Sequence, residues 1–184
     1  MKFIKTIIPG VFILEPSVFG DHRGYFLESF NLEKFEENVC SIKFVQDNES
    51  KSTKGVLRGL HFQKPPFDQT KLVRCIYGEV MDVVVDIRKG SPTYGKHMTV
   101  KLSGENKRQL FIPKGFAHGF SVLSETAVFA YKVDNTYAPE YDSGIRYDDK
   151  ELNIDWGLTG EEAQLSVKDE NLSFFKDLDS PFKF

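Results

Sequence analysis

The sequence lacks the usual features of membrane-spanning and disulfide-stabilised proteins. Its 184 residues contain only two cysteines, Cys40 and Cys75, and no CxxC pair, so a reducing, cytoplasmic location without disulfides is expected. No apolar run approaches the roughly 18 residues of a transmembrane helix, so no membrane association is expected. The first eight residues resemble a signal peptide only briefly, because Lys5, Pro9 and Gly10 interrupt the apolar stretch.

A basic excess is also missing. The chain has 24 Lys and Arg against 27 Asp and Glu, a net charge of -3, whereas nucleic-acid-binding domains usually carry a basic excess. Nucleic acid is therefore not expected as a partner. Hydrophobic residues (40%) and aromatic residues (14%) are too abundant for a disordered chain. The length suits one globular domain, expected over residues 1–184, with a sizeable buried core.

Helical periodicity is scarce, and strand patterns dominate. Asn31 could cap a short helix with Leu32, Phe35 and Val39 on one face, and a second short helix is expected to follow Thr159. Short apolar runs bounded by turn residues predict strands at 11–14, 25–30, 71–77, 80–86, 97–102, 109–112, 119–123 and 127–133. This pattern predicts a mainly β fold: an antiparallel jelly-roll β-barrel with a few short helices.

Two segments carry candidate functional residues. Residues 113–120 read Pro-Lys-Gly-Phe-Ala-His-Gly-Phe, and this Pro-x-Gly-x-x-His spacing resembles the second signature of cupin jelly rolls. In metal-binding cupins the first signature supplies His-x-His and a nearby Glu. The matching stretch 61–68 has one histidine, His61, with no nearby Glu and two prolines. A mononuclear metal site needs three or four suitable ligands, so no metal is expected.

Histidines in a metal-free pocket can still perform acid–base chemistry. A neutral imidazole acts as a general base when a carboxylate holds its tautomer, and a tyrosine phenol can act as the acid. A base and an acid on opposite faces of a substrate carbon would make an epimerase. The sequence alone does not establish that such groups face one another.

An ordered series of motifs resembles the dTDP-4-dehydrorhamnose 3,5-epimerase family over essentially residues 1–170. The motifs are GDHRGYFLE at 20–28, QDN at 46–48, VLRGLHFQ at 56–63, KLVR at 71–74, PKGFAHGF at 113–120, YK at 131–132 and LSVKD at 165–169. The resemblance implies a cupin-like jelly roll. It also implies conversion of dTDP-4-dehydro-6-deoxy-D-glucose to dTDP-4-dehydro-L-rhamnose through an enolate, without metal or organic cofactor, in rhamnose biosynthesis.

The resemblance also implies roles for individual residues. His61 matches the base, Asp169 the carboxylate that orients it, Tyr131 the acid and Lys71 the cation near the enolate oxygen. The residues that match substrate contacts are Arg23, Glu28, Gln46, Asn48, Arg58, Lys71, His118, Tyr137, Asp142 and Lys168. Among these, the hypothesis for Tyr137 is stacking on thymine. Asp142 departs from the family, which often has Glu there, so the contact geometry at this position is expected to differ.

The family resemblance implies a homodimer in which strands and loops cross between subunits. Arg23 and Glu28 are the residues expected to serve the neighbouring subunit's site. A C-terminal extension from about residue 170, rich in Phe, matches no functional motif.

Three other functions fit parts of the sequence. The first is a related epimerase that inverts only C3 or only C5, and the motif residues hardly separate it from the double epimerase. The second is a metal-dependent cupin, and the third a sugar-binding jelly roll without enzymatic activity. Non-functional interpretations also exist: Tyr131 lies in an apolar strand where a core tyrosine is common, and residues 168–170 could be a surface charge run.

Overall fold

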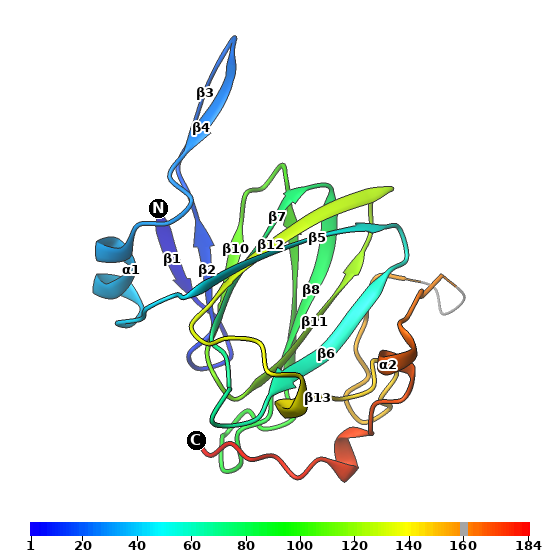
Figure 1. The fold of residues 1–184 in the computed structure, drawn as a ribbon. Helices are drawn as coiled ribbons and strands as arrows, with labels where there is room; N and C mark the ends of the chain where they lie inside the picture. The colour runs from blue at the N-terminus through cyan, green and yellow to red at the C-terminus, as the bar shows by residue number, and fades with distance from the viewer. Residues whose placement is uncertain (159–161) are drawn as a thin grey trace.

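Two facing antiparallel sheets form the body of the protein in the computed structural model, which describes residues 1–158 and 162–184 (Figure 1). The larger sheet has the order β1 (Lys2–Lys5), β2 (Phe12–Glu15), β10 (Gln109–Ile112), β7 (Lys71–Tyr77), β12 (Thr126–Val133) and β5 (Gln46–Thr53). The smaller sheet has the order β13 (Asp142–Gly144), β6 (Leu57–Gln63), β11 (Phe116–Val122), β8 (Glu79–Asp86) and β9 (His97–Ser103). This arrangement confirms the predicted antiparallel β architecture.

The hydrophobic core lies between the two sheets and continues onto their outer faces. Val73 of β7 and Phe129 of β12 meet Val84 of β8 in the central cluster. On β8 the neighbouring residues Val83 and Val85 point the other way and join a second cluster beneath the C-terminal segments. The unbroken valine run of this strand is explained by burial on both faces, since each buried aliphatic side chain contributes roughly 1.5–3 kcal/mol.

The predicted N-terminal helix is confirmed as α1 (Leu32–Asn38). The Asn31 side chain accepts a hydrogen bond from the Lys34 backbone N–H at 3.1 Å, as expected for an N-cap. Phe35 is fully buried and packs edge-on against Phe111 of the larger sheet, with ring centroids 5.2 Å apart. Leu32, which the periodicity placed on the same face, is exposed instead, because the helix contacts the sheet mainly through Phe35.

The strand predictions agree with the structure where apolar runs are long. The predicted strands 71–77 and 109–112 match β7 and β10, whereas the predicted strand 25–30 ends at Leu27 and β11 begins earlier, at Phe116. The strands β5 and β6 were not predicted, since β5 is a polar edge strand and glycine interrupts β6. The helix expected after Thr159 begins on residues 159–161, outside the described part of the chain.

A hairpin of β3 (Val18–Asp21) and β4 (Gly24–Leu27) projects away from the body (Figure 1). Its aromatic side chains Phe19, Tyr25 and Phe26 are exposed. A cluster of this kind on a projecting element is typical of a protein contact surface.

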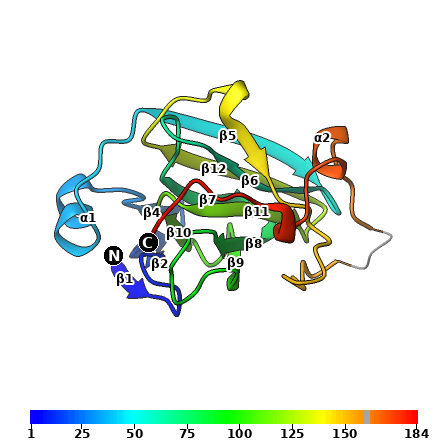
Figure 2. The same ribbon diagram turned by 90° about the horizontal axis from the view of Figure 1, so that it is seen from below.

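The C-terminal segment runs across one end of the barrel after the short helix α2 (Val167–Glu170), past the 3₁₀ turn Phe175–Asp177 (Figure 2). The Lys89 N–H donates to the Phe182 carbonyl at 2.9 Å, and the Ser180 hydroxyl donates to the carbonyl of Ile87. The Phe182 ring packs edge-on against Phe62, with centroids 5.9 Å apart. These contacts fasten the chain end to the barrel.

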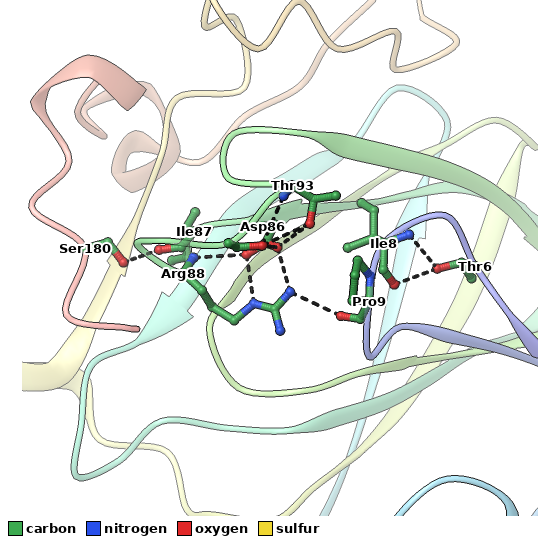
Figure 3. A network of polar contacts seen from close by, with 9 residues as sticks. Thr6, Ile8, Pro9, Asp86, Ile87, Arg88, Thr93 and Ser180 are labelled. Carbon is green, nitrogen blue, oxygen red and sulfur yellow. Dashed lines mark hydrogen bonds and ion pairs between the residues drawn. The ribbon is translucent and has the colours of Figure 1, made fainter. Parts of the chain in front are cut away.

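The loop between β8 and β9, which contacts this segment through Ile87 and Lys89, is organised by the buried carboxylate of Asp86 (Figure 3). Asp86 accepts hydrogen bonds from Arg88 at 2.6 and 2.9 Å, from Ser91 at 2.6 Å and from Thr93 at 2.6 Å. Arg88 also donates to the carbonyl of Pro9 at 3.1 Å, which ties the N-terminal loop to the same point.

The helices of the described residues are all too short or too polar to cross a membrane. A further 3₁₀ turn, Pro139–Tyr141, lies between β12 and β13.

A close approach of β6 and β11 depends on two glycines. A Cβ on Gly59 would lie 2.5 Å from the Gly119 Cα and 2.9 Å from the carbonyl oxygen of His118. The pairing is irregular here: His118 pairs with His61 and Phe120 with Arg58, so two residues of β6 oppose one of β11. Such bulges redirect side chains, and this one sets the two histidines opposite each other.

We predict that Gly59→Ala lowers the free energy of unfolding by about 2 kcal/mol more than Gly24→Ala, because it forces the backbones of β6 and β11 apart. Gly24 is a matched control: its φ of +132° is close to the +128° of Gly59, but a Cβ there would meet nothing within 4 Å. Urea denaturation of both variants measures the difference. Equal losses would show that backbone conformation alone, and not the contact, requires glycine.

Candidate active site

A cavity of about 480 Å³ opens between the two sheets. Six of the residues proposed from the sequence line it together: Arg58, His61, Lys71, His118, Tyr131 and Asp169. They come from β6, β7, β11, β12 and α2, so segments far apart in the sequence converge on one space. Phe120 and Phe129 stack on each other, centroids 4.2 Å apart, and give the cavity an apolar wall.

His61 and Asp169 form a hydrogen-bonded pair at the smaller sheet. The His61 Nε2 is bonded to Asp169 Oδ1, and the Asp169 side chain is almost fully buried. The other carboxylate oxygen, Oδ2, accepts from the Ser166 hydroxyl at 2.9 Å. Burial alone would raise the pKa of Asp169, but the hydrogen bond and charge of His61 and the hydroxyl of Ser166 hold that pKa below its ordinary value. The carboxylate therefore stays ionised and fixes the imidazole tautomer.

Helix α2 places Asp169 by its own capping pattern. Ser166 is the N-cap, and its hydroxyl oxygen accepts from the Asp169 N–H at 3.1 Å. At the other end of the helix, the Arg146 guanidinium donates to the carbonyl of Glu170 at 2.7 Å. The possible surface charge run at 168–170 is thus a short helix with its aspartate turned inward.

His118 is held by a second carboxylate, which was not foreseen from the sequence. Its Nε2 lies 3.0 and 3.1 Å from the two carboxylate oxygens of Asp82, a fully buried residue on β8. Burial lowers the pKa of His118 although Asp82 opposes this, and burial raises the pKa of Asp82 although His118 and Lys71 oppose it. Burial therefore disfavours charge on both members of the pair. The available signal was a lone aspartate within the apolar run Val80–Val85.

Lys71 brings a titratable cation into the cavity from the larger sheet. Burial lowers the pKa of Lys71 to about 8. The cation Lys168 also lowers this pKa, whereas the carboxylates Asp142 and Asp82 raise it. At neutral pH the amine is mostly protonated, and the resulting ammonium is poorly hydrated. It can therefore stabilise a negative charge that develops on a bound molecule.

Tyr131 faces the same cavity from β12 of the larger sheet, opposite the sheet that carries His61. Burial raises the pKa of Tyr131, and the nearby cation Arg58 only partly offsets this, so its phenol keeps its proton at neutral pH. The Arg58 guanidinium donates two hydrogen bonds to the Ser52 hydroxyl oxygen, at 3.2 and 3.3 Å. His61 and Tyr131 thus line one cavity from two different sheets.

Three further predicted residues form a cluster beside the cavity. The Tyr137 phenol donates to Asp142 at 3.1 Å, and Lys168 forms an ion pair with the same carboxylate. Gln46 and Asn48 lie on β5, where their side chains are bonded to each other at 2.8 Å and Asn48 pairs in register with Tyr131.

Two predicted residues lie away from this cavity within the single chain. Arg23 is at the tip of the projecting hairpin, with 79% of its side chain exposed and an ion pair to Asp21. Glu28 follows the hairpin and pairs with Lys34 of α1 at 2.8 Å.

No group of three His, Cys, Asp or Glu side chains gathers as metal ligands anywhere in the described residues 1–158 and 162–184. The two cavity histidines are each bonded to one carboxylate instead.

The fold and the site together define a jelly roll equipped for acid–base chemistry on a small molecule. The chain belongs to the dTDP-4-dehydrorhamnose 3,5-epimerase family, whose model matches residues 5–177. This confirms the resemblance drawn from the motifs.

Several relatives support the assignment. A dTDP-4-dehydrorhamnose 3,5-epimerase of Shigella flexneri is 59% identical over 180 residues, 97% of this chain and 98% of the relative. A dTDP-6-deoxy-D-glucose-3,5-epimerase of Legionella pneumophila, solved in complex with dTDP-4-keto-L-rhamnose, is 51% identical with a TM-score of 0.95, covering 100% and 98% of the two chains. A dTDP-4-dehydrorhamnose 3-epimerase of Streptomyces niveus is 39% identical over 157 residues, 85% and 76% of the two chains.

We predict an alkaline fall in kcat/KM that follows the titration of Lys71, with a midpoint near its pKa of about 8. Below this pH the ammonium is charged, and above it the neutral amine no longer stabilises negative charge. The pH profile of Lys71→Arg tests this assignment, because a guanidinium stays protonated throughout the range and removes this alkaline limb. A limb that persists near pH 8 in the variant would assign it to another group.

Proposed function

We propose that this chain epimerises dTDP-4-dehydro-6-deoxy-D-glucose at C3 and C5 to dTDP-4-dehydro-L-rhamnose, in nucleotide-sugar (rhamnose) biosynthesis. The observation that carries the proposal is the placement of His61 and Tyr131 on opposite sheets around one cavity. Removal of a proton from one face of a carbon and its return to the other inverts that carbon. This geometry supports such a reaction without a metal or an organic cofactor.

The first step is removal of a proton from carbon. The C4 ketone of the substrate makes the hydrogens at C3 and C5 acidic, because the resulting electron pair is delocalised onto the ketone oxygen as an enolate. His61 takes the proton, and the Asp169 carboxylate stabilises the imidazolium that forms. Lys71 stabilises the negative charge on the enolate oxygen.

The second step returns a proton to the opposite face. Tyr131 donates its phenolic proton to the carbon, the enolate electron pair forms the new C–H bond and the ketone is restored. The His61 imidazolium then releases its proton to solvent and the Tyr131 phenolate takes up a proton from solvent, and the two steps repeat at the other carbon. Arg58 and Lys168 supply positive charge suited to a diphosphate, with Gln46, Asn48 and His118 as further substrate contacts. Tyr137 stacks on the nucleobase, and Asp142 accepts the hydrogen bond from the Tyr137 phenol.

A second candidate is epimerisation at a single carbon. The Streptomyces niveus relative is named as a 3-epimerase, and the same base, acid and enolate would serve one centre. The higher identity to proteins named as 3,5-epimerases favours inversion at both carbons.

We further propose that residues 1–184 form one domain, with the extension from about residue 170 closing the barrel end, and that two copies form a homodimer. The exposed aromatic residues of the β3–β4 hairpin support the dimer, since they would be buried against a second copy. Arg23 and Glu28 would then contribute to the partner's cavity. Two free cysteines, Cys40 and Cys75, support a cytoplasmic location.

NMR of the substrate incubated with the protein in deuterated water tests the function, with a chelator present and no added metal. We expect deuterium at both C3 and C5. Label at one carbon only would establish the single-centre reaction, and a need for added metal would favour a metal-dependent cupin. Binding of the substrate without any label would indicate a sugar-binding protein.

Variants in the same experiment assign the two roles. His61→Ala should lower the exchange rate by about 10²–10⁴-fold, the usual contribution of a general base. Tyr131→Phe should slow epimerisation more than exchange, because the proton can still leave but is not returned from the other face. Full exchange in the first variant, or unchanged epimerisation in the second, would contradict the assignment.

Mixing two inactive variants tests the shared site of the dimer. Arg23→Ala and His61→Ala should each be inactive, but a mixed dimer keeps one intact cavity if Arg23 acts on the partner's site. Random exchange of subunits in a twofold dimer should then restore about a quarter of wild-type activity. No recovery, with mixed dimers verified by mass spectrometry, would place Arg23 outside the partner's site.

A further inference from the structure

Gln63, two residues after His61 on β6, is a buried amide that joins two loops. Only 4% of its surface is exposed. Its Nε2 donates to the carbonyl of Phe67 at 2.6 Å and to the carbonyl of Thr136 at 3.1 Å, while its Oε1 accepts from the Ala138 N–H at 2.7 Å. These partners fix the orientation of the amide, because only the nitrogen can donate to the two carbonyls.

Two of these partners are the residues on either side of Tyr137. Gln63 therefore holds the backbone immediately before this tyrosine, at Thr136, and immediately after it, at Ala138. Tyr137 itself is 57% exposed, and its phenol is bonded to Asp142. A ring this exposed has little packing to direct it, so the fixed backbone and the phenol hydrogen bond together set where it points.

The same two loops are joined at neighbouring points. The Thr70 N–H donates to Asp134 Oδ1 at 2.6 Å, and the Gln69 side chain donates to the carbonyl of Asn135 at 2.8 Å. These bonds hold the loop before β7 against the loop after β12, but neither involves the residues that flank Tyr137. Gln69 is thus a second glutamine whose side chain joins the same two loops, but at Asn135 and not beside Tyr137.

We propose that Gln63 is a positioning residue for nucleotide recognition: it preorganises Tyr137 to stack on the flat base of a nucleoside diphosphate. The inference rests on the proposed function for the identity of the ligand.

The contribution of Gln63 should appear in affinity and not in the chemical step. Gln63 is absent from the described residues that line the cavity with His61 and Tyr131. A loop that must be ordered on binding costs affinity, whereas a loop already held in place does not. Removal of the Gln63 amide leaves the buried Ala138 N–H and the carbonyls of Phe67 and Thr136 without this partner, which favours rearrangement of the loop.

Calorimetry with dTDP and steady-state kinetics test the proposal. Gln63→Met, which keeps the side-chain length but removes the hydrogen bonds, should raise the Kd for dTDP and the KM about tenfold, as expected from lost preorganisation. The turnover rate at saturating substrate should stay within about twofold of wild type, since the catalytic groups are untouched. Gln69→Met is the matched control and should leave both constants within about twofold.

A double-mutant cycle shows whether Gln63 acts through the tyrosine. In a Tyr137→Ala background, Gln63→Met should weaken dTDP binding by less than about twofold, because the ring it positions is gone. Equal losses in both backgrounds would overturn the proposal, as would a fall in turnover larger than the rise in KM. Should Gln63→Met fail to fold, Gln63→Glu provides the same comparison, since it keeps the acceptor for Ala138 and loses the donor.

The outcome is separable from that of the proposed function. Loss of dTDP affinity in the Gln63 variant, with no deuterium exchange by the wild type, would remove the epimerase activity and keep the role of Gln63. Exchange by the wild type with unchanged dTDP affinity in the variant would keep the epimerase activity and remove the role of Gln63.

Discussion

The hydrogen bond between His61 and Asp169 is the constraint on which the site depends. It joins a strand of the barrel to a four-residue helix that lies 108 residues later in the chain. A helix this short has little stability of its own. It is held at one end by the Ser166 cap and at the other by Arg146, and the segment that follows is fastened along the barrel end. The placement of one carboxylate therefore draws on packing far from the cavity.

Local patterns were enough to predict much of the fold. The strands β7 and β10 lie next to each other in the larger sheet and contribute to core clusters on both of its faces, so their apolar runs predicted strands. The Asn31 cap was readable because side-chain capping is a local interaction. β5 escaped prediction because an edge strand tolerates polar residues. The path of β6 depends on Gly59 meeting Gly119, a contact between distant segments that no local pattern contains.

The candidate site was predictable to the extent that the motifs matched a family. Sequence separation alone gave no reason for His61 and Asp169 to meet, and the structure now places them in contact. The sequence did not identify Asp82 and Gln63 as functional residues, because their hydrogen-bond partners belong to other strands and loops. An aspartate in a valine-rich strand was a readable sign, since a buried carboxylate requires a partner. A glutamine at the end of a strand gave no comparable sign.

The separation of His61 and Asp169 along the chain also has a consequence for the synthesis of the protein on the ribosome. At elongation rates of roughly 5–20 residues per second, about 5 to 20 seconds separate the synthesis of His61 from that of Asp169. During that interval the strands β7 to β13 are made, and His61 has no Asp169 carboxylate to bond. The chemistry is thus unavailable to an unfinished chain. A chain that ends before residue 169 therefore lacks the hydrogen bond between His61 and Asp169.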